Sequence, residues 1–431
     1  MAAVLAWLAE TRPTTDQIVA DRARLLLLDT LGCAIAGLAH EEVSAYVSQL
    51  AGQQGVTCPG FPAGLTPSHF GQAMTMAVCW DEACEGLASA HGRPGLHAVP
   101  AAVSMALDGG ASLATTLDAL VVGYEVGGRL GAAWRIRDGM HVDGTWGIVA
   151  AAASAAALLN DRDQEGLAAA IEAAACMIPA SLYAPARQGA TTRNLYAAQS
   201  VSRGIETALA MGAGITAPRE ALSEAAALTF DPDQAAALTP AGTWLLLQGY
   251  FKPFAAVRHV HYGVQAALDW RAASGSQSQS ITAIHLQTYP EAMTYCGNRV
   301  PGIAIQAQFS LTYGLAHALA RGGLGPEAYD ADALSDDEIN RLERLIVVED
   351  TGAFAAGRGA HVTIKSDGVE TNSTVERVDG DPDQPMARAD VIAKFERFAA
   401  PRLGASQATA LARRIIEAPL DQSLADVLNG A

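Results

Sequence analysis

The sequence changes its pattern at residues 250–261, which read Tyr-Phe-Lys-Pro-Phe-Ala-Ala-Val-Arg-His-Val-His. Before this segment, apolar residues recur at the spacing of buried or amphipathic helices, and alanine is abundant. After it come an alternating segment, Ile281–Tyr289, and the dipeptide Asp367-Gly368 between two further alternating runs, which is a strong hairpin signal. This change from helical to strand spacing predicts a helical domain followed by a domain that mixes helices and strands.

The expected fold is therefore mainly α with a smaller α+β domain. Residues 1–255 and 388–431 are predicted to form a large all-helical domain, and residues 256–387 an α+β lid domain, so that the C-terminal helices return to the first domain. A chain of 431 residues is long enough for two or three domains. Thr14 and Gln17 have the spacing of a capping box, which predicts that the first long helix begins directly after Thr14.

The charge and the cysteines of the chain exclude several kinds of partner. The formal net charge is −17 at pH 7, so neither nucleic acid nor an anionic membrane surface is an expected partner. An anionic substrate would need a local basic pocket set against this repulsive field. The six cysteines form no Cys-x-x-Cys pair, so we expect free thiols in a reducing cytoplasm and no structural metal. No basic segment precedes the first apolar residues, so a secretory signal is not expected.

Ionisable residues gather in four segments of the chain. Three are glycine-rich loops between predicted helices, at residues 80–100, 138–147 and 185–194, and the fourth is the 250–261 segment, which holds one of only three lysines. The residues of interest there are Asp81, His91, His97, His141, Arg193, Lys252, Arg258 and His261. Cations beside imidazoles suit the removal of a proton from a carbon next to a carboxylate, because the cations stabilise the developing enediolate while a histidine moves the proton.

Other classes of site have no signature in the sequence. No Gly-x-Gly-x-x-Gly follows a strand pattern, and neither a Gly-x-x-x-x-Gly-Lys-Ser/Thr nor a His-Glu-x-x-His motif occurs. His259 and His261 are two residues apart, a spacing that points side chains in different directions on a helix, so a metal pair is not expected there.

Short motifs spread along the chain resemble those of the MmgE/PrpD family. In order, they are Leu28-Asp29-Thr30-Leu31-Gly32-Cys33-Ala34-Ile35-Ala36-Gly37, the acidic pair Asp81-Glu82, Val99-Pro100-Ala101, Gly123-Tyr124-Glu125, His141-x-x-Gly144-Thr145-Trp146-Gly147, Phe251-Lys252-Pro253-Phe254 with Arg258 and His261, and Arg299-x-Pro301 followed by Gln308-Phe309-Ser310. The family includes 2-methylcitrate dehydratase, cis-aconitate decarboxylase and iminodisuccinate epimerase. The resemblance implies a large helical domain, a smaller α+β lid, a site between them and a homodimer, with no metal and no organic cofactor.

The functional positions of the family map onto this chain one by one. The resemblance implies catalytic roles for Asp81 before the first loop, for His141 in the second loop, for Lys252 at the domain crossing and for Tyr295 in the lid.

Three departures from the family pattern stand out. Arg93-Pro94 replaces His-Pro, so that the role of the histidine passes to His91 or His97 or is absent. Arg193 replaces a lysine, and a guanidinium keeps an anion clamp but does not give up its proton. The family sequence His-Pro-Thr-Gly is reduced to His141-Val142-Asp143-Gly144.

The expected activity is a cofactor-independent acid/base reaction next to a carboxylate of a di- or tricarboxylic acid, foremost the dehydration of a 2-methylcitrate-like hydroxy polycarboxylate. His141 or a first-loop histidine would act as the base, and Lys252 would bind carboxylate or serve as the acid. The residues expected to bind the anionic substrate are Arg93, Arg193, Arg258 and His261. Three alternatives stay open: an epimerase of an iminodisuccinate-like dicarboxylate, a cis-aconitate-type decarboxylase, and a binding homologue without catalysis.

Overall fold

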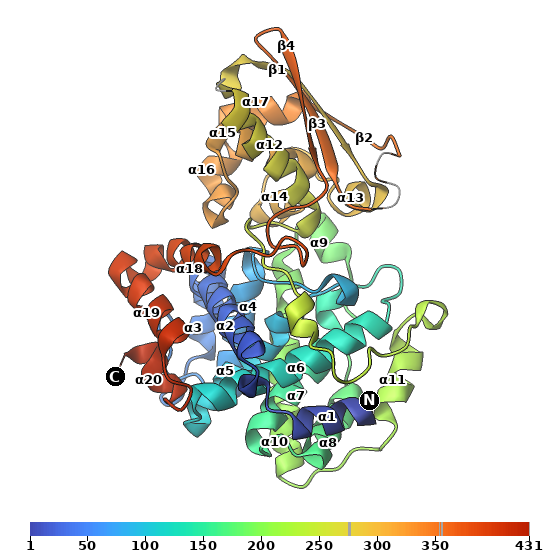
Figure 1. Ribbon diagram of the computed structural model, residues 1–431, viewed down its shortest axis with the longest axis vertical. Helices are drawn as coiled ribbons and strands as arrows, with labels where there is room; N and C mark the ends of the chain where they lie inside the picture. Colours follow the sequence, from blue (N-terminus) through green and yellow to red (C-terminus); the bar gives the residue numbers. More distant parts are fainter. Residues whose placement is uncertain (275–276, 353, 355–356, 431) are drawn as a thin grey trace.

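The computed structural model describes residues 1–274, 277–352, 354 and 357–430. Figure 1 shows a large helical body at one end and a smaller body with a β-sheet at the other, which confirms the expected fold class. The helices of the large body are α1 (Ala2–Glu10), α2 (Gln17–Gly37), α3 (Glu41–Leu50), α4 (Pro67–Trp80), α5 (Pro94–Gly109), α6 (Leu113–Ala133), α7 (Gly147–Leu159), α8 (Gln164–Ala175), α9 (Ala184–Gln188), α10 (Leu195–Gly212), α11 (Ala221–Thr229), α18 (Arg388–Leu403), α19 (Ala405–Glu417) and α20 (Leu424–Asn429). Those of the smaller body are α12 (His261–Ser274), α13 (Pro290–Tyr295), α14 (Ala304–Gln308), α15 (Leu311–Arg321), α16 (Ala331–Leu334) and α17 (Asp337–Leu345).

The core of the large body forms around α7. Residues Gly147 to Ala157 of this helix are all buried, and α5, α6 and α10 pack around it. Most of the side chains of α7 are alanine, so the backbones of its neighbours come close and leave few voids.

The first long helix begins differently from the sequence-based expectation. Asp16 caps α2, because its carboxylate accepts hydrogen bonds from the N–H groups of Ile18 and Val19. Thr14 instead lies in a 3₁₀ turn, Pro13–Thr15, so the predicted capping box was wrong. Pro13 begins this turn, and the turn occupies the residues up to Thr15, so α2 begins only at Gln17.

The sheet of the smaller body has the order β2-β1-β3-β4, with β1 (Ile281–Thr288) parallel to β2 (Ile346–Glu349) and antiparallel to β3 (Ala360–Ser366). β3 continues into β4 (Val369–Val375) through Asp367 and Gly368, whose φ angles of 51° and 78° are those of a two-residue hairpin turn. The predicted hairpin is therefore confirmed. Helix α12 packs against β3 and β4, and α15 packs on α12 (Figure 1).

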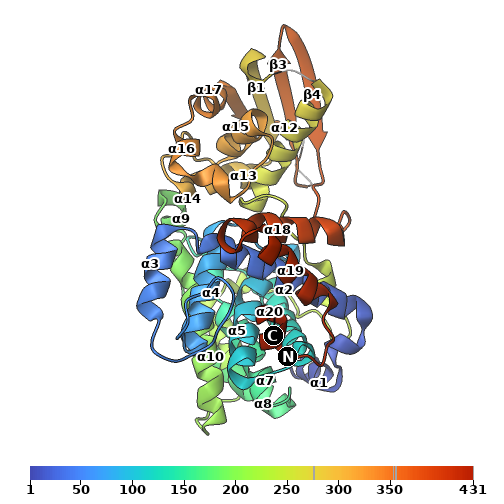
Figure 2. The same cartoon turned by 90° about the vertical axis from the view of Figure 1, so that its left-hand side faces the viewer.

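The C-terminal helices lie on the large body (Figure 2), where α18 and α19 pack against α2. Gly32 permits this contact, because a Cβ at that position would lie 2.9 Å from Cδ2 of Phe395. Lys394 of α18 reaches through the interface and places Nζ 2.6 Å from Oδ1 of Asp29 and 2.6 Å from the carbonyl oxygen of Ala83. The domain boundaries given from the sequence, after residues 255 and 387, stay predictions.

One further observation concerns membranes. Within the described ranges no single helix is long and apolar enough to cross a membrane, and α2 and α3 reach that length and apolarity only together, with a bend of 101° between them.

We expect Lys394→Met to lower the free energy of unfolding by about 3–5 kcal/mol, because it leaves the carboxylate of Asp29 buried without its cation. Urea unfolding measures this change. Lys365→Met is the matched control: Lys365 is exposed on β3, so a change within about 0.5 kcal/mol is expected. Equal effects of the two substitutions would show that the ion pair does not hold α18 in place.

Candidate active site

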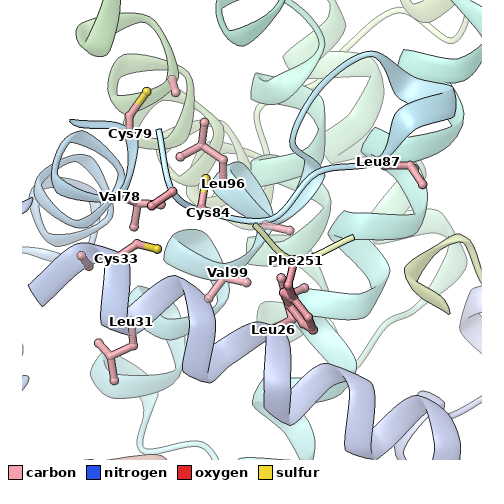
Figure 3. Close-up of a cluster of buried hydrophobic side chains, with 14 of the residues drawn as sticks. Leu26, Leu31, Cys33, Val78, Cys79, Cys84, Leu87, Leu96, Val99 and Phe251 are labelled. Carbon is pink, nitrogen blue, oxygen red and sulfur yellow. The ribbon is translucent and has the colours of Figure 1, made fainter. Parts of the chain in front are cut away.

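The crossing segment between the two bodies is tied to the first loop, which runs from residue 81 to residue 93. Gly86 and Tyr250 exchange two backbone hydrogen bonds of 3.0 and 2.8 Å. A Cβ on Gly86 would lie 2.4 Å from the hydroxyl oxygen of Tyr250, so this approach requires glycine. Phe251 is buried and lies beside Leu26 in a cluster under the loop (Figure 3). These contacts place the next residue, Lys252, against the loop.

A cavity of about 420 Å³ lies at this junction. It is lined by the first loop, by residues of the 134–143 segment, by Tyr183 and Arg193, by the crossing segment, and by Glu291, Tyr295, Phe309 and Arg358 of the smaller body. Both bodies therefore contribute to one site, and the volume is typical of pockets that bind small molecules.

The floor of the cavity is a cluster of buried charges. The carboxylate of Glu82 accepts hydrogen bonds from Arg193 and from Nζ of Lys252 at 3.2 Å, and lies 3.1 Å from Nη1 of Arg93. The carboxylate of Asp143 pairs with Arg93 and lies 3.7 Å from Nη2 of Arg193. All five side chains are at most 7% exposed. Buried charges are stable only when paired, so the cluster fixes the positions of the segments that carry it.

Lys252 has an unusual environment. Its ammonium group donates to the carbonyl oxygen of Glu82 at 2.6 Å as well as to the carboxylate. Burial, reinforced by the nearby guanidinium of Arg93, lowers the pKa of Lys252 to about 7. The group is therefore poised to gain or lose a proton near neutral pH.

His141 has a defined tautomer when neutral. Its Nδ1 accepts a hydrogen bond of 3.2 Å from the backbone N–H of Asp143, so the proton of the neutral ring is on Nε2. Burial lowers the pKa of His141, which keeps the ring neutral, and the ring stacks on Tyr183. A neutral His141 is therefore a hydrogen-bond donor in the cavity, which differs from the expected role of base.

Asp143 holds the other end of the cluster. Burial alone would raise its pKa, but the guanidinium of Arg93 lowers the pKa of Asp143 to about 2. Asp143 therefore stays ionised and keeps Arg93 in place.

The structure brings together seven of the ten residues proposed from the sequence. The cavity is lined by His91, Arg93, His141, Arg193, Lys252, Arg258 and Tyr295. Arg258 has a partner of its own, since its guanidinium pairs with Asp381 and lies 4.9 Å from the ring centre of Tyr250.

The other three predicted residues lie outside the lining. Asp81 is fully buried and pairs with Nε2 of His40 at 2.7 Å. His97 is not in the loop, because Pro94 already begins α5; its ring nitrogens face the carbonyl oxygens of Arg93 and Asp143. His261 begins α12, is fully buried and contacts the carbonyl oxygen of Ala256 at 3.0 Å. Their positions favour structural roles.

Several lining residues were not proposed from the sequence. The sequence marks Glu82 only as one of an acidic pair, yet Glu82 lines the cavity. Its backbone has a left-handed φ of 53°. Asp143 belongs to the motif His141-Val142-Asp143-Gly144 but is not among the ten residues proposed from the sequence. His259 lines the cavity with Nδ1 2.6 Å from the hydroxyl oxygen of Tyr289. The adjacent acids Asp81 and Glu82 and the nearby histidines His259 and His261 were visible in the sequence. Neither pattern predicts which of the two residues lines the cavity.

One group in the floor resembles a set of metal ligands. Cys79, Glu82 and Asp143 have ligand atoms within 4.8 Å of one another. In this arrangement the guanidinium groups of Arg93 and Arg193 already contact both carboxylates and neutralise their charge. The donor set is therefore engaged by protein cations and does not have the open carboxylate oxygens that a cation would need.

Comparison with known families gives two matches. A model described as the MmgE/PrpD N-terminal domain matches residues 3–231, and one described as the MmgE/PrpD C-terminal domain matches residues 254–422. The second match spans the smaller body together with α18 and α19, which pack on the large one. A search of curated proteins found no match to the chain.

We expect the ammonium of Lys252 to titrate near pH 7, because burial disfavours its charged form. The chain has only three lysines, so NMR of protein labelled with ¹³C at lysine Cε should give three signals. One signal should shift near pH 7 and should be absent from Lys252→Met. The signal of Lys394 should shift last. Burial lowers the pKa of Lys394, but the carboxylate of Asp29 outweighs this effect and raises the pKa above its usual value. Three signals that all titrate above pH 9 would contradict the proposed environment.

Proposed function

Because the chain belongs to the MmgE/PrpD family, we propose that it is a hydro-lyase that removes water from a hydroxy carboxylic acid by acid/base catalysis, without an organic cofactor. Membership supports a dehydratase- or lyase-like enzyme at the level of the family. The di- and tricarboxylic acids of the family are the first substrates to test.

The observation that carries this proposal is the position of Lys252. A lysine with a pKa of about 7 lies in the cavity beside two guanidinium groups, those of Arg93 and Arg193. Dehydration next to a carboxylate needs a group that removes a proton from carbon and cations that stabilise the enediolate. The floor offers both within one buried cluster.

The reaction can be written with Lys252 as the single proton carrier. The carboxylate of the substrate binds at Arg193 and Arg93, and the neutral amine of Lys252 removes the proton from Cα. The enediolate then collapses with formation of the C=C bond and cleavage of the bond from Cβ to oxygen. The ammonium of Lys252 returns the proton to the departing hydroxide, so that water leaves and the amine is regenerated.

His141 supports this sequence as a donor. The Nε2–H of the neutral ring would donate to an oxygen of the enediolate, where negative charge increases during the reaction. This assignment exchanges the roles expected from the sequence, because Lys252 becomes the base and His141 the hydrogen-bond donor. The role of Arg193 as an anion clamp is kept.

A second candidate reaction is epimerisation. His259 faces the same cavity, and the hydroxyl of Tyr289 contacts its Nδ1. Two proton-transferring groups, Lys252 and His259, would allow a proton to leave one face of a stereocentre and return to the other. Solvent exchange at Cα without loss of water would favour this reaction.

We expect Lys252→Met to reduce turnover by about 10²–10⁴, the usual contribution of a general acid or base. The assay incubates hydroxy di- and tricarboxylates with the protein in D₂O and follows alkene formation and deuterium at Cα by NMR. His141→Asn should also lower turnover, because it removes the donor to the enediolate.

His361→Asn is the matched control, since His361 lies on β3, outside the cavity lining, and should leave turnover unchanged. Turnover by Lys252→Met equal to that of the wild type would contradict the assignment of Lys252 as the proton carrier. No alkene and no exchange with any acid would favour a binding homologue.

A further inference from the structure

The charge balance of the cavity points to a substrate with one carboxylate and a planar apolar body, and we propose that class of acid as the true substrate of this site. The proposal rests on the function proposed above, because it concerns the same cavity and the same lysine. It departs from the compact polycarboxylates that the family resemblance suggests.

The floor has room for one further negative charge. Among the described residues it holds three cations, Arg93, Arg193 and Lys252, and two carboxylates, Glu82 and Asp143. The excess is a single positive charge when Lys252 is protonated. One unused donor also remains, because Nε of Arg193 is buried and has no hydrogen-bond partner. A single carboxylate would therefore complete the cluster while Lys252 is protonated, and the unused donor of Arg193 remains for it when Lys252 is the neutral amine.

Elsewhere in the described lining, two of the three remaining arginines are paired with carboxylates and the third, Arg135, contacts backbone carbonyl oxygens. Arg258 is paired with Asp381, and Arg358 lies 3.4 Å from the carboxylate of Glu291. Arg135 donates to the carbonyl oxygens of Gly131 and Ala132.

One more carboxylate, that of Asp138, lines the same space. Counted over the described lining residues together with Asp381, six cations face five carboxylates. The three lining histidines add no charge near neutral pH, because burial lowers the pKa of His91, His141 and His259.

Among the described lining residues, a second carboxylate on the substrate would find only one arginine without a carboxylate partner, the half-buried Arg135. A buried carboxylate without a counter-ion or hydrogen bonds is strongly unfavourable, whereas one at the open rim would gain only a screened interaction. The site therefore discriminates against di- and tricarboxylates in its buried part.

The walls fit an apolar and planar group. Leu87, Trp134, Ile136, Met140 and Val142 line the side next to the first loop. On another side the rings of His141, Tyr183, Tyr295 and His259 form a row, with successive centres 5.8, 5.3 and 6.1 Å apart. Aromatic rings of a ligand stack favourably on such surfaces.

The test uses 3-phenylpropanoate as the probe, with propanoate, succinate and citrate as comparisons, and isothermal titration calorimetry at physiological ionic strength. We expect 3-phenylpropanoate to bind about tenfold or more tightly than each of the other three, because only it satisfies both the floor and the walls. Tighter binding of succinate or citrate would overturn the inference.

Variants locate the bound probe. Tyr295→Ala should weaken 3-phenylpropanoate by about 2- to 10-fold and leave propanoate unchanged, because a stacked ring contributes about 0.5–1.5 kcal/mol. Val369→Ala, which removes an exposed apolar side chain on β4, is the control and should change neither affinity. Equal losses for both acids in Tyr295→Ala would also count against the aromatic wall.

The two proposals fail in different ways. If Lys252→Met weakens every acid but citrate binds the wild type most tightly, the site stands and the substrate class is wrong. If Lys252→Met binds every acid as the wild type does, or if the wild type binds none, the catalytic site itself is wrong and the substrate class falls with it.

Discussion

The pairing of Glu82 with three buried cations is the interaction on which the site depends. Arg93 comes from the first loop, Arg193 from the segment before α10, and Lys252 from the crossing between the bodies, and each would be unstable in this interior without the carboxylate. The pairing thus brings together segments that are far apart in sequence. Burial of Lys252 in this cluster, reinforced by the nearby guanidinium of Arg93, lowers the pKa of its ammonium group.

The fold was largely readable from the sequence, because it follows from local patterns. Alternation predicted β1, the Asp367-Gly368 turn predicted the β3–β4 hairpin, and apolar density predicted the buried helices. The start of α2 was not readable, because the preceding proline turn moves the cap from Thr14 to Asp16. Thr14 and Asp16 are both suitable N-cap residues, and the local sequence alone does not determine which of them caps the helix.

The site was readable only in part. Composition and the lysine count singled out Lys252, and glycine-rich loops singled out His141 and Arg193, all of which line the cavity. Of two adjacent acids, Glu82 lines the cavity and Asp81 does not, and the sequence gives no sign of the left-handed φ of 53° at Glu82. His97 was misplaced because Pro94 begins a helix rather than continuing the loop. The inferred substrate rests on the charge balance of the cavity. That balance could not be predicted from the sequence, because its charged residues come from separate segments that meet only in the folded protein.

The central claim is that the neutral amine of Lys252 removes a proton from the substrate. The most direct test is the pH dependence of kcat/KM for an acid that the protein turns over. The account predicts that kcat/KM rises with pH and levels off above about 7, as the free lysine loses its proton, because the pKa of Lys252 is about 7. A profile that is flat between about pH 6 and 9, or that rises only above about pH 9, would contradict it.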